Sequence, residues 1–385
     1  MGILLNKQLY YVGVVFVGSA LSAIANWKSV PIIFLSGLSL SQYILAAIVL
    51  PITIITLVSS IFTYRKFGTK FILIAAGISN SIALVSKASI SKYNVFAAFV
   101  VIAFQLIAAN IHLLMNPLYI SHISPENTRD SYGILHFVGI IFGTYIGNHT
   151  LYTSHRKIFL YVFASISLIQ SILIWFIPNI TPEITARSNA SKEKKYIFHS
   201  ILLILAPLII IVDIVISNAT PEHISSYKII QVNNILQIII SIILISIAFS
   251  IYFFGLRIHW IISSAFSLIF LIICSILAFT GKRNMFSYGV ASGNTISLFL
   301  GLNSVGLSLI CQFSDNLIFF SQILYSICSE ITQIIYIFSR SKIWLIVFVI
   351  FDILFIIYGI VLFPDLKANK EKEKYELDAM TTPII

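Results

Sequence analysis

Long apolar segments alternate with short polar breaks along the whole chain. Each segment holds about 20 mostly apolar residues, which is the length of a helix that crosses the hydrocarbon core of a bilayer. About twelve such segments follow one another, and the breaks between them are only a few residues long. The pattern predicts about twelve transmembrane helices and leaves almost no residues for a soluble domain.

One hydrophilic break, residues 179–195, is longer than the others and divides the chain nearly in half. The sequence therefore predicts an all-α membrane protein with a six-helix bundle over residues 1–178, a short linker over 179–195, a second bundle over 196–364 and a charged tail over 365–385. The predicted spans cover residues 8–25, 40–62, 71–85, 95–115, 133–146, 158–176, 197–216, 229–252, 259–279, 286–310, 317–338 and 343–363.

Composition supports this prediction and excludes other classes of protein. A chain of 385 residues that is 58% hydrophobic and 10% charged, with a mean hydropathy of +0.98, has too much apolar surface for one soluble core. The net charge of +10 lies in loops and tails, where it indicates orientation and contact with anionic lipid headgroups, not nucleic acid. More basic residues fall on the side of the loops shared with the termini, which predicts that both termini are cytoplasmic.

The sequence offers no signal for a cofactor or a metal. Cys274, Cys311 and Cys328 fall inside apolar segments without paired spacing, so they are interpreted as packing residues. No arrangement of Ser, His and Asp, of His and Glu, or of paired carboxylates recurs at helical spacing, which argues against a membrane-embedded enzyme. The N-terminus runs directly into the first span and is interpreted as a retained signal-anchor.

Residues 116–147 carry a pattern that generic membrane segments lack. Pro117 and Pro125 flank a short polar turn, and Arg129 follows it. The next segment is lined by glycines at Gly133, Gly139, Gly143 and Gly147.

This stretch resembles the loop between spans four and five of the sugar porter family of the major facilitator superfamily. That family's signature is Pro-x-Tyr-x-x-Glu-(Ile/Val)-(Ala/Ser)-Pro followed by Arg-Gly. The chain departs from it at His122, where the family has Glu, and at Asp130, where it has Gly. The residues that match in register are Pro117, Tyr119, Ile123, Ser124, Pro125 and Arg129. The resemblance implies a shortened, diverged member with two pseudo-symmetric six-helix bundles.

Four further landmarks resemble the family's cytoplasmic motifs. Phe67-Gly68-Thr69-Lys70 follows span two and Phe254-Gly255-Leu256-Arg257 follows span eight, where the superfamily has Asp-Arg-x-Gly-Arg-Arg/Lys. Acidic and basic residues also follow spans six and twelve. In the family such loops form an inner gate that opens and closes through ion pairs between the halves. The gate implied here comprises Lys66, Gly68, Lys70, Pro117, Tyr119, His122, Pro125, Arg129, Glu183, Arg187, Gly255, Arg257, Asp365 and Lys367.

Polar side chains inside spans are costly unless they pair or line a water-filled cavity, so they are candidates for a solute site. The alternative is hydrogen bonding between helices of the bundle. The set is Asn110, His112, His136, Gln170, Asp213, Asn233, Asn234, Gln237, Asn294, Asn303, Glu330 and Asp352. From it, and from the family's pattern, the predicted substrate-binding residues are His136, Phe137, Asp213, Asn234, Asn294, Asn303 and Glu330.

The family's sugar ligands are mostly absent from the matching positions. Its span-five Gln falls on Phe137, and its polar run in span seven falls near Pro207 to Asp213, where only Asp213 is polar. Its Trp residues of spans ten and eleven fall near Gly306 and Glu330. Three explanations stay open: a different substrate, a rebuilt pocket, or loss of transport.

The expected function is therefore a multi-pass carrier, a monomer in the plasma membrane, that moves a hexose or a similar polyhydroxylated solute by alternating access. The family's proton symporters carry an Asp in span one, whereas residues 10–26 here contain no acidic residue. This favours facilitated diffusion, unless Asp213 or Glu330 titrates instead. The alternatives are a transport-dead relative that acts as a nutrient receptor or scaffold, and a proton-coupled carrier of a different small solute.

Overall fold

The computed structural model describes residues 2–25, 42–89, 95–124, 128–151, 155–181, 226–282, 284–298, 304–311, 315–338 and 342–363. Every regular element within them is a helix. The N-terminal helices are α1 (Gly2–Ala25), α3 (Gln42–Phe67), α4 (Thr69–Ser89), α5 (Val95–Ile123), α6 (Arg129–Leu151) and α7 (Arg156–Leu173), the last followed by the 3-10 turn η1 (Ile174–Phe176). The C-terminal helices are α11 (Ser226–Phe279), α12 (Met285–Leu298), α13 (Ser304–Ile310), α14 (Asp315–Phe338) and α15 (Ile343–Val361).

The helices confirm the predicted spans wherever the structure describes them. Spans one to six each correspond to one helix, and so do spans eleven and twelve. Spans eight and nine are joined in α11 across Gly255, whose φ of 75° and ψ of 167° are not helical. Span ten consists of α12 and α13. Span seven lies outside the described residues, as does most of the linker, so the division into domains stays a prediction.

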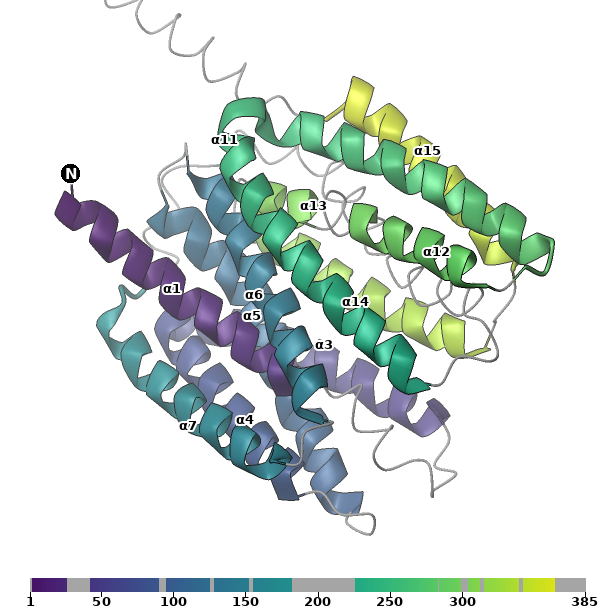
Figure 1. Cartoon of the computed structure of the whole chain (residues 1–385). Coiled ribbons are helices and arrows are strands. Elements are labelled where there is room, and N and C mark those ends of the chain that lie inside the picture. Colours follow the sequence, from purple (N-terminus) through teal and green to yellow (C-terminus); the bar gives the residue numbers. More distant parts are fainter. Residues whose placement is uncertain are drawn as a thin grey trace, which may run out of the picture.

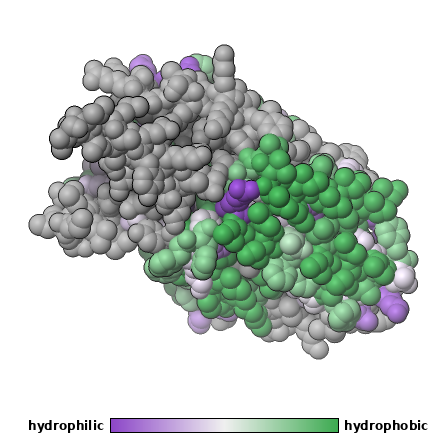
Figure 2. All heavy atoms as spheres, turned by 90° about the horizontal axis from the view of Figure 1, so that it is seen from above, coloured by the Kyte–Doolittle hydropathy of each residue, from purple (hydrophilic) through white to green (hydrophobic). Residues whose placement is uncertain are grey.

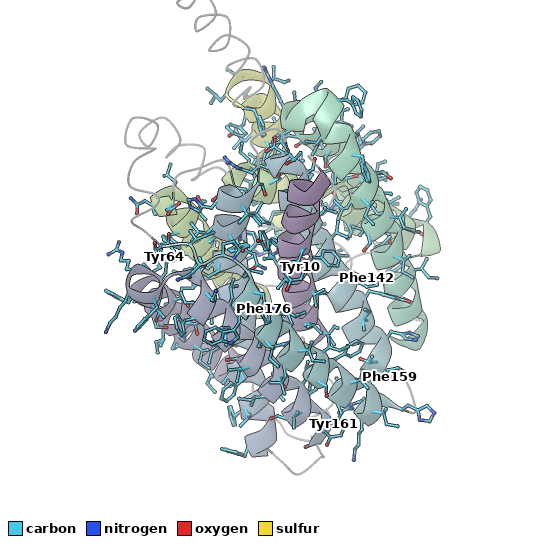
Figure 3. All side chains as sticks on the ribbon, turned by 90° about the vertical axis from the view of Figure 1, so that its left-hand side faces the viewer. Tyr10, Tyr64, Phe142, Phe159, Tyr161 and Phe176 are labelled. Carbon is cyan, nitrogen blue, oxygen red and sulfur yellow. The ribbon has the colours of Figure 1, made fainter. Side chains whose placement is uncertain are left out.

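The described surface suits a lipid environment. Six of the described helical segments are long and apolar enough to cross a membrane. The coloured part of the surface in Figure 2, which is the described part, is mostly hydrophobic with small hydrophilic spots. On α7 and the turn η1 that follows it, the aromatic side chains of Phe159, Tyr161 and Phe176, labelled in Figure 3, are all exposed. Large side chains that would be unfavourable in water are therefore placed where lipid tails would meet them.

The N-terminal and C-terminal helices pack against each other around one continuous core. In Figure 1, α4 and α7 lie on one side of the molecule and α12 and α15 on the other, with α5, α6 and α13 between them. The core combines Leu118 and Ile134 from the N-terminal helices with Leu244, Leu309 and Ile318 from the C-terminal ones.

Glycines bring α6 very close to its neighbours. An added Cβ at Gly143 would lie 2.0 Å from the backbone oxygen of Ala20 in α1, and one at Gly147 would lie 2.7 Å from that of Ile24. An added Cβ at Gly139 would lie 3.0 Å from the backbone oxygen of Phe16, which is also in α1. Small residues four apart let membrane helices approach through their backbones. The glycines seen in the sequence therefore form a seam between α1 and α6.

Candidate functional site

The same turn occurs in both groups of helices. Gly68 and Gly255 adopt φ angles of 77° and 75°, a region that glycine enters without steric cost. Two residues after each glycine, a basic side chain donates to backbone carbonyls near the end of its own group. Lys70 Nζ donates to the oxygen of Trp175 at 2.9 Å, and Arg257 donates to those of Gly359 (3.0 Å) and Ile360.

These basic residues therefore lie where a helix ends and its carbonyls attract positive charge. Lys70 and Arg257 each tie their own group of helices together, and their contacts do not cross to the other group. Lys66 is exposed and lies 5.2 Å from the ring centre of Phe67.

A polar contact joins the two groups at the ends of α3, α5 and α14. His122 Nε2 lies 2.9 Å from Asp315 Oδ1, and the hydroxyl of Tyr64 donates to Asp315 Oδ2 at 3.0 Å. The ring of Tyr64 also packs edge to face on Phe319. We call His122, Asp315 and Tyr64 the latch. Its ionisable side chains are partly shielded from water, with exposed fractions of 22% for His122 and 15% for Asp315.

Beside the latch, α6 and α13 meet backbone to backbone. Ser308 Oγ donates to the backbone oxygen of Asp130 at 2.6 Å. An added Cβ at Gly133 would lie 2.9 Å from the Cα of Ser308. Arg129, the first residue of α6, donates to the backbone oxygen of Ser124 at 3.3 Å and so supports the turn between α5 and α6. The two groups are thus closed against each other at this end.

Pro117 and Tyr119 lie inside α5, next to the latch in sequence. Both are buried, and Tyr119 is 0% exposed. No described residue is a hydrogen-bond partner for its hydroxyl. Membrane helices tolerate an internal proline because the neighbouring helices satisfy the freed backbone groups. Pro117 and Tyr119 are therefore buried parts of α5, the helix whose last turn carries His122.

A stripe of polar residues continues from the latch along α14. Asp315, Phe319, Gln322 and Ser326 follow one another at spacings of four, three and four residues, which places them on one helix face. Gln322 is 0% exposed, yet both of its amide atoms lack a partner among the described residues. The hydroxyl oxygen of Ser326 and that of neighbouring Ser321 also lack one. Buried polar groups are normally paired, so this stripe is the strongest described candidate for a solute site.

Polar residues of α3 and α5 lie at a similar depth. Thr53 precedes Tyr64 by eleven residues on the same face of α3, and its hydroxyl accepts a hydrogen bond from Asn110 Nδ2 in α5 at 3.2 Å. At a rise of about 1.5 Å per residue, Thr53 and Ser326 both lie roughly 16 Å from the latch. Because Tyr64 and Phe319 bring α3 and α14 into contact, the two stripes run toward the membrane interior together.

Comparison with known proteins was made for the sequence and for the fold. No family model and no curated protein matches the sequence. Solved structures of the proton:xylose symporter XylE do match the fold. The structure bound to 6-bromo-6-deoxy-D-glucose has a TM-score of 0.72 at 13% identity, covering 93% of this chain and 96% of that one. The inward-open structure from E. coli has a TM-score of 0.61 at 14% identity, covering 94% of this chain and 96% of that one.

The chain has the major facilitator fold. It is an integral membrane protein that crosses the bilayer several times. At such low identity the match establishes the fold alone.

In this major facilitator fold, His136 lies within the N-terminal helices. Its Nδ1 is 2.7 Å from Ser19 Oγ in α1, and Asn116 Nδ2 donates to the same oxygen at 2.6 Å. His112 Nδ1 lies 3.5 Å from Asn116 Oδ1. All four side chains are buried, and neither histidine Nε2 has a partner among the described residues. We call these residues the imidazole cluster.

The other predicted substrate-binding residues are dispersed. Phe137 is buried in the core shared by both groups. Asn294 lies in α12, is 0% exposed and contacts Ser267 of α11, with an Oδ1 to Oγ distance of 3.0 Å. The structure therefore does not bring His136 and Asn294 together. Asn234 and Glu330 lie in α11 and α14, but their side chains are not described. Outside the described residues lie Asp213, Asn303, Pro125, Glu183, Arg187, Asp365 and Lys367.

Sequence analysis missed Asp315, Gln322 and Ser326. The helical spacing that continues from Asp315, just before predicted span 317–338, to Gln322 and Ser326 within it was a usable signal, but Ser and Gln are also common in bundle packing. Only the contact of α14 with α3 and α5 shows that this face lies between the two groups.

Proposed function

We propose that the chain is a multi-pass membrane carrier of the sugar porter type that moves a hexose or a similar polyhydroxylated solute by alternating access. The observation that carries the proposal is the latch, which closes the two groups of helices against each other through residues of the signature-like stretch. His122 and Arg129 belong to that stretch, and His122 contacts Asp315 of the other group. A contact that joins two rigid groups at one end is what a carrier must break and remake.

The contacts between the two groups support a state closed at this end. His122 and Tyr64 contact Asp315, and Ser308 contacts the backbone of Asp130. With both termini in the cytoplasm, the latch end is the cytoplasmic one. We therefore propose that the structure represents a carrier with its inner gate closed, in the plasma membrane.

For the solute site we propose Gln322 and Ser326 of α14, with Thr53 and Asn110 facing them from α3 and α5. An unpaired buried polar group costs about 1–3 kcal/mol. Hydroxyl groups of a polyol can donate and accept, so a bound solute would offset that cost. This set replaces the sugar ligands that the matching family positions lack.

The test is counterflow of labelled solutes in liposomes that contain the purified protein. Hexoses and polyols are compared with nucleosides and amino acids. Saturable exchange of a hexose or polyol supports the carrier. Binding of a hexose without exchange would instead support a transport-dead receptor. Exchange confined to nucleosides or amino acids would contradict the proposal that the solute is a hexose or polyol.

A pair of glutamine variants locates the site. Replacing Gln322 by Leu should raise the half-saturating concentration of the solute about ten-fold, because one lost hydrogen bond of about 1.4 kcal/mol corresponds to that factor. Gln170→Leu is the matched control: Gln170 is also buried with an unpartnered Oε1, but it lies in α7 beside Gly18 and Gly77. Equal effects of the two variants would remove Gln322 from the site.

A further inference from the structure

A buried carboxyl group lies in the middle of α15. Asp352 is nine residues from Ile343 and nine from Val361, the two ends of that helix. Its side chain is 4% exposed. A charged carboxylate at the centre of a membrane segment is costly unless it is paired with a cation or lies in water.

Asp352 takes part in a three-residue cluster formed by three helices. Ser267 Oγ of α11 lies 2.7 Å from Asp352 Oδ2 and 3.0 Å from Asn294 Oδ1 of α12. All three side chains are buried. Figure 1 shows α12 and α15 beside the second half of α11, so the cluster lies within the C-terminal helices. We call Asp352, Ser267 and Asn294 the carboxyl cluster.

The hydrogen bonds of the cluster accommodate a bound proton. Ser267 has one hydroxyl hydrogen and lies within hydrogen-bond distance of two acceptor oxygens, so it donates to one of them at a time. When Asp352 carries a proton, its carboxyl group can donate to Ser267 Oγ while Ser267 donates to Asn294 Oδ1. When Asp352 is a carboxylate, Ser267 donates to it, and the Asn294 amide, whose Nδ2 has no partner among the described residues, turns to donate to Ser267. A neutral carboxyl group also removes the charge from the apolar interior.

The surroundings offer no compensating positive charge among the described residues of the three helices. The titratable side chains nearest in sequence to the cluster are Cys274 on α11, Tyr288 on α12 and Tyr358 on α15, each six or seven residues away from its cluster member. Arg257 and His259 lie beside the kink at Gly255, ten and eight residues from Ser267, where Arg257 donates to the carbonyls of Gly359 and Ile360 and His259 contacts Ser250 and Gly255. Lys282 and Lys342 lie just outside the ends of α11 and α15. The hydrophobic residues beside the cluster include Leu271, Ala291 and Phe348.

We propose that Asp352 is a proton-binding site. Its carboxylate takes one proton from water and becomes a neutral carboxyl group, and no other bond changes. Loss of the proton places a charge among apolar side chains and favours a rearrangement of α11, α12 and α15 that admits water.

The position of α12 links this site to the closed end of the molecule. α12 carries Asn294, and α13, the next described helix of the same predicted span, carries Ser308, which contacts Asp130 of the other group. We expect the proton on Asp352 to favour one arrangement of that span over another, and so to couple solute movement to a pH gradient. This coupling rests on the proposed carrier function, whereas proton binding itself does not.

Infrared spectroscopy of the purified protein tests proton binding without any transport. The C=O stretch of a neutral carboxyl group is separate from the bands of a carboxylate. At neutral pH we expect such a band in the native protein, its loss in Asp352→Asn, and its retention in Asp315→Asn. Ser267→Ala, which keeps the carboxyl group, should shift the band because its hydrogen-bond partner is gone. A band unchanged in both Asp352→Asn and Ser267→Ala would overturn the proposal.

Two further measurements separate the alternatives. If addition of Na⁺ at constant pH removes the same band that Asp352→Asn removes, the site binds a cation and the proton assignment is wrong. In liposomes, the ratio of uptake with and without a pH gradient should differ from one in the native protein and equal one in Asp352→Asn. An unchanged ratio, with the infrared band assigned to Asp352, would overturn the coupling alone.

Discussion

The two groups of helices bury polar side chains of different chemistry. The N-terminal helices enclose the imidazole cluster, in which His112 and His136 can stay neutral while hydrogen-bonded to Asn116 and Ser19. The C-terminal helices enclose Asp352, whose side chain becomes neutral only by binding a proton. Before residue 182 the sequence contains only two acidic residues, Glu126 and Asp130. Any buried carboxyl chemistry in the described helices therefore belongs to the C-terminal group.

The two groups also use glycine differently. In the N-terminal helices, Gly139, Gly143 and Gly147 bring the α6 backbone onto α1. In the C-terminal helices, an added Cβ at Gly293 or Gly359 would meet the side chain of Phe270 or Trp260, not a backbone, and one at Gly289 in α12 would meet nothing within 4 Å. The N-terminal group is thus fixed by backbone contact, which suits a rigid unit that moves as a whole.

The largest expected effect comes from breaking the glycine seam. Gly143→Val should destabilise the protein by about 1–3 kcal/mol or more, because overpacking forces the helices apart and the nearest atom is a backbone oxygen 2.0 Å from the added Cβ. Thermal unfolding in detergent measures the change.

Gly289→Ala in the C-terminal helices is the matched control. It should be neutral or stabilising, since Ala is favoured over Gly in a helix interior by about 0.5–1 kcal/mol. If Gly143→Val and Gly289→Ala unfold at the same temperature, the seam does not hold α1 and α6 together.

A smaller effect, and one that depends on pH, should distinguish the two clusters. Ser267→Ala removes the one described hydrogen-bond partner of Asp352, which costs about 1–3 kcal/mol. The carboxyl group loses its proton as pH rises, and an ionised carboxylate needs a hydrogen-bond donor more than a neutral one does. The destabilisation by Ser267→Ala should therefore grow with rising pH.

Ser19→Ala should not show that growth, because Asn116 and His136 are neutral there and their side chains remain 3.4 Å apart. Both variants are compared by thermal unfolding at neutral and alkaline pH. A parallel response of the two variants to alkaline pH would mean that Asp352 gains no charge in that range.

Much of the fold follows from the sequence alone because a membrane-spanning helix is a continuous run of apolar residues along the chain. A bilayer demands about 20 apolar residues per helix, so the spans at α4 and α15 are visible in hydropathy, and the two Phe-Gly-x-basic turns identify equivalent points of the chain. The structure adds what those turns do. Lys70 and Arg257 stabilise helix ends within their own groups.

The candidate site was harder to predict because it depends on which helix faces meet. His136 has the residue type and depth of a solute ligand, yet its neighbours Gly139 and Gly143 turn that face of α6 toward α1. Gln322 looks ordinary in the sequence, yet it shares a face with Asp315, which contacts the other group. Which helices pack together decides whether His136 and Gln322 face their own group or the other one. Residue type alone does not reveal that packing.

The latch joins the two chemistries, since the N-terminal helices supply an imidazole and the C-terminal helices a carboxylate. His122 Nε2 and Asp315 Oδ1 lie 2.9 Å apart and both side chains are partly exposed. Because a partly exposed charged pair contributes about 0.2–1 kcal/mol, breaking the latch should raise the open population at most about five-fold.

Cys311 provides the measurement, since it is 1% exposed and follows α13 at the closed end. With Cys274 and Cys328 replaced by Ser, a maleimide at one fixed pH should modify Cys311 faster in Asp315→Asn than in the native protein. Loss of the latch opens this end, and a fixed pH avoids the general increase of the thiolate fraction with pH. Arg65→Ala, an exposed charge change beside Tyr64, should keep the native rate. If Asp315→Asn keeps it too, the latch does not control this end of the molecule.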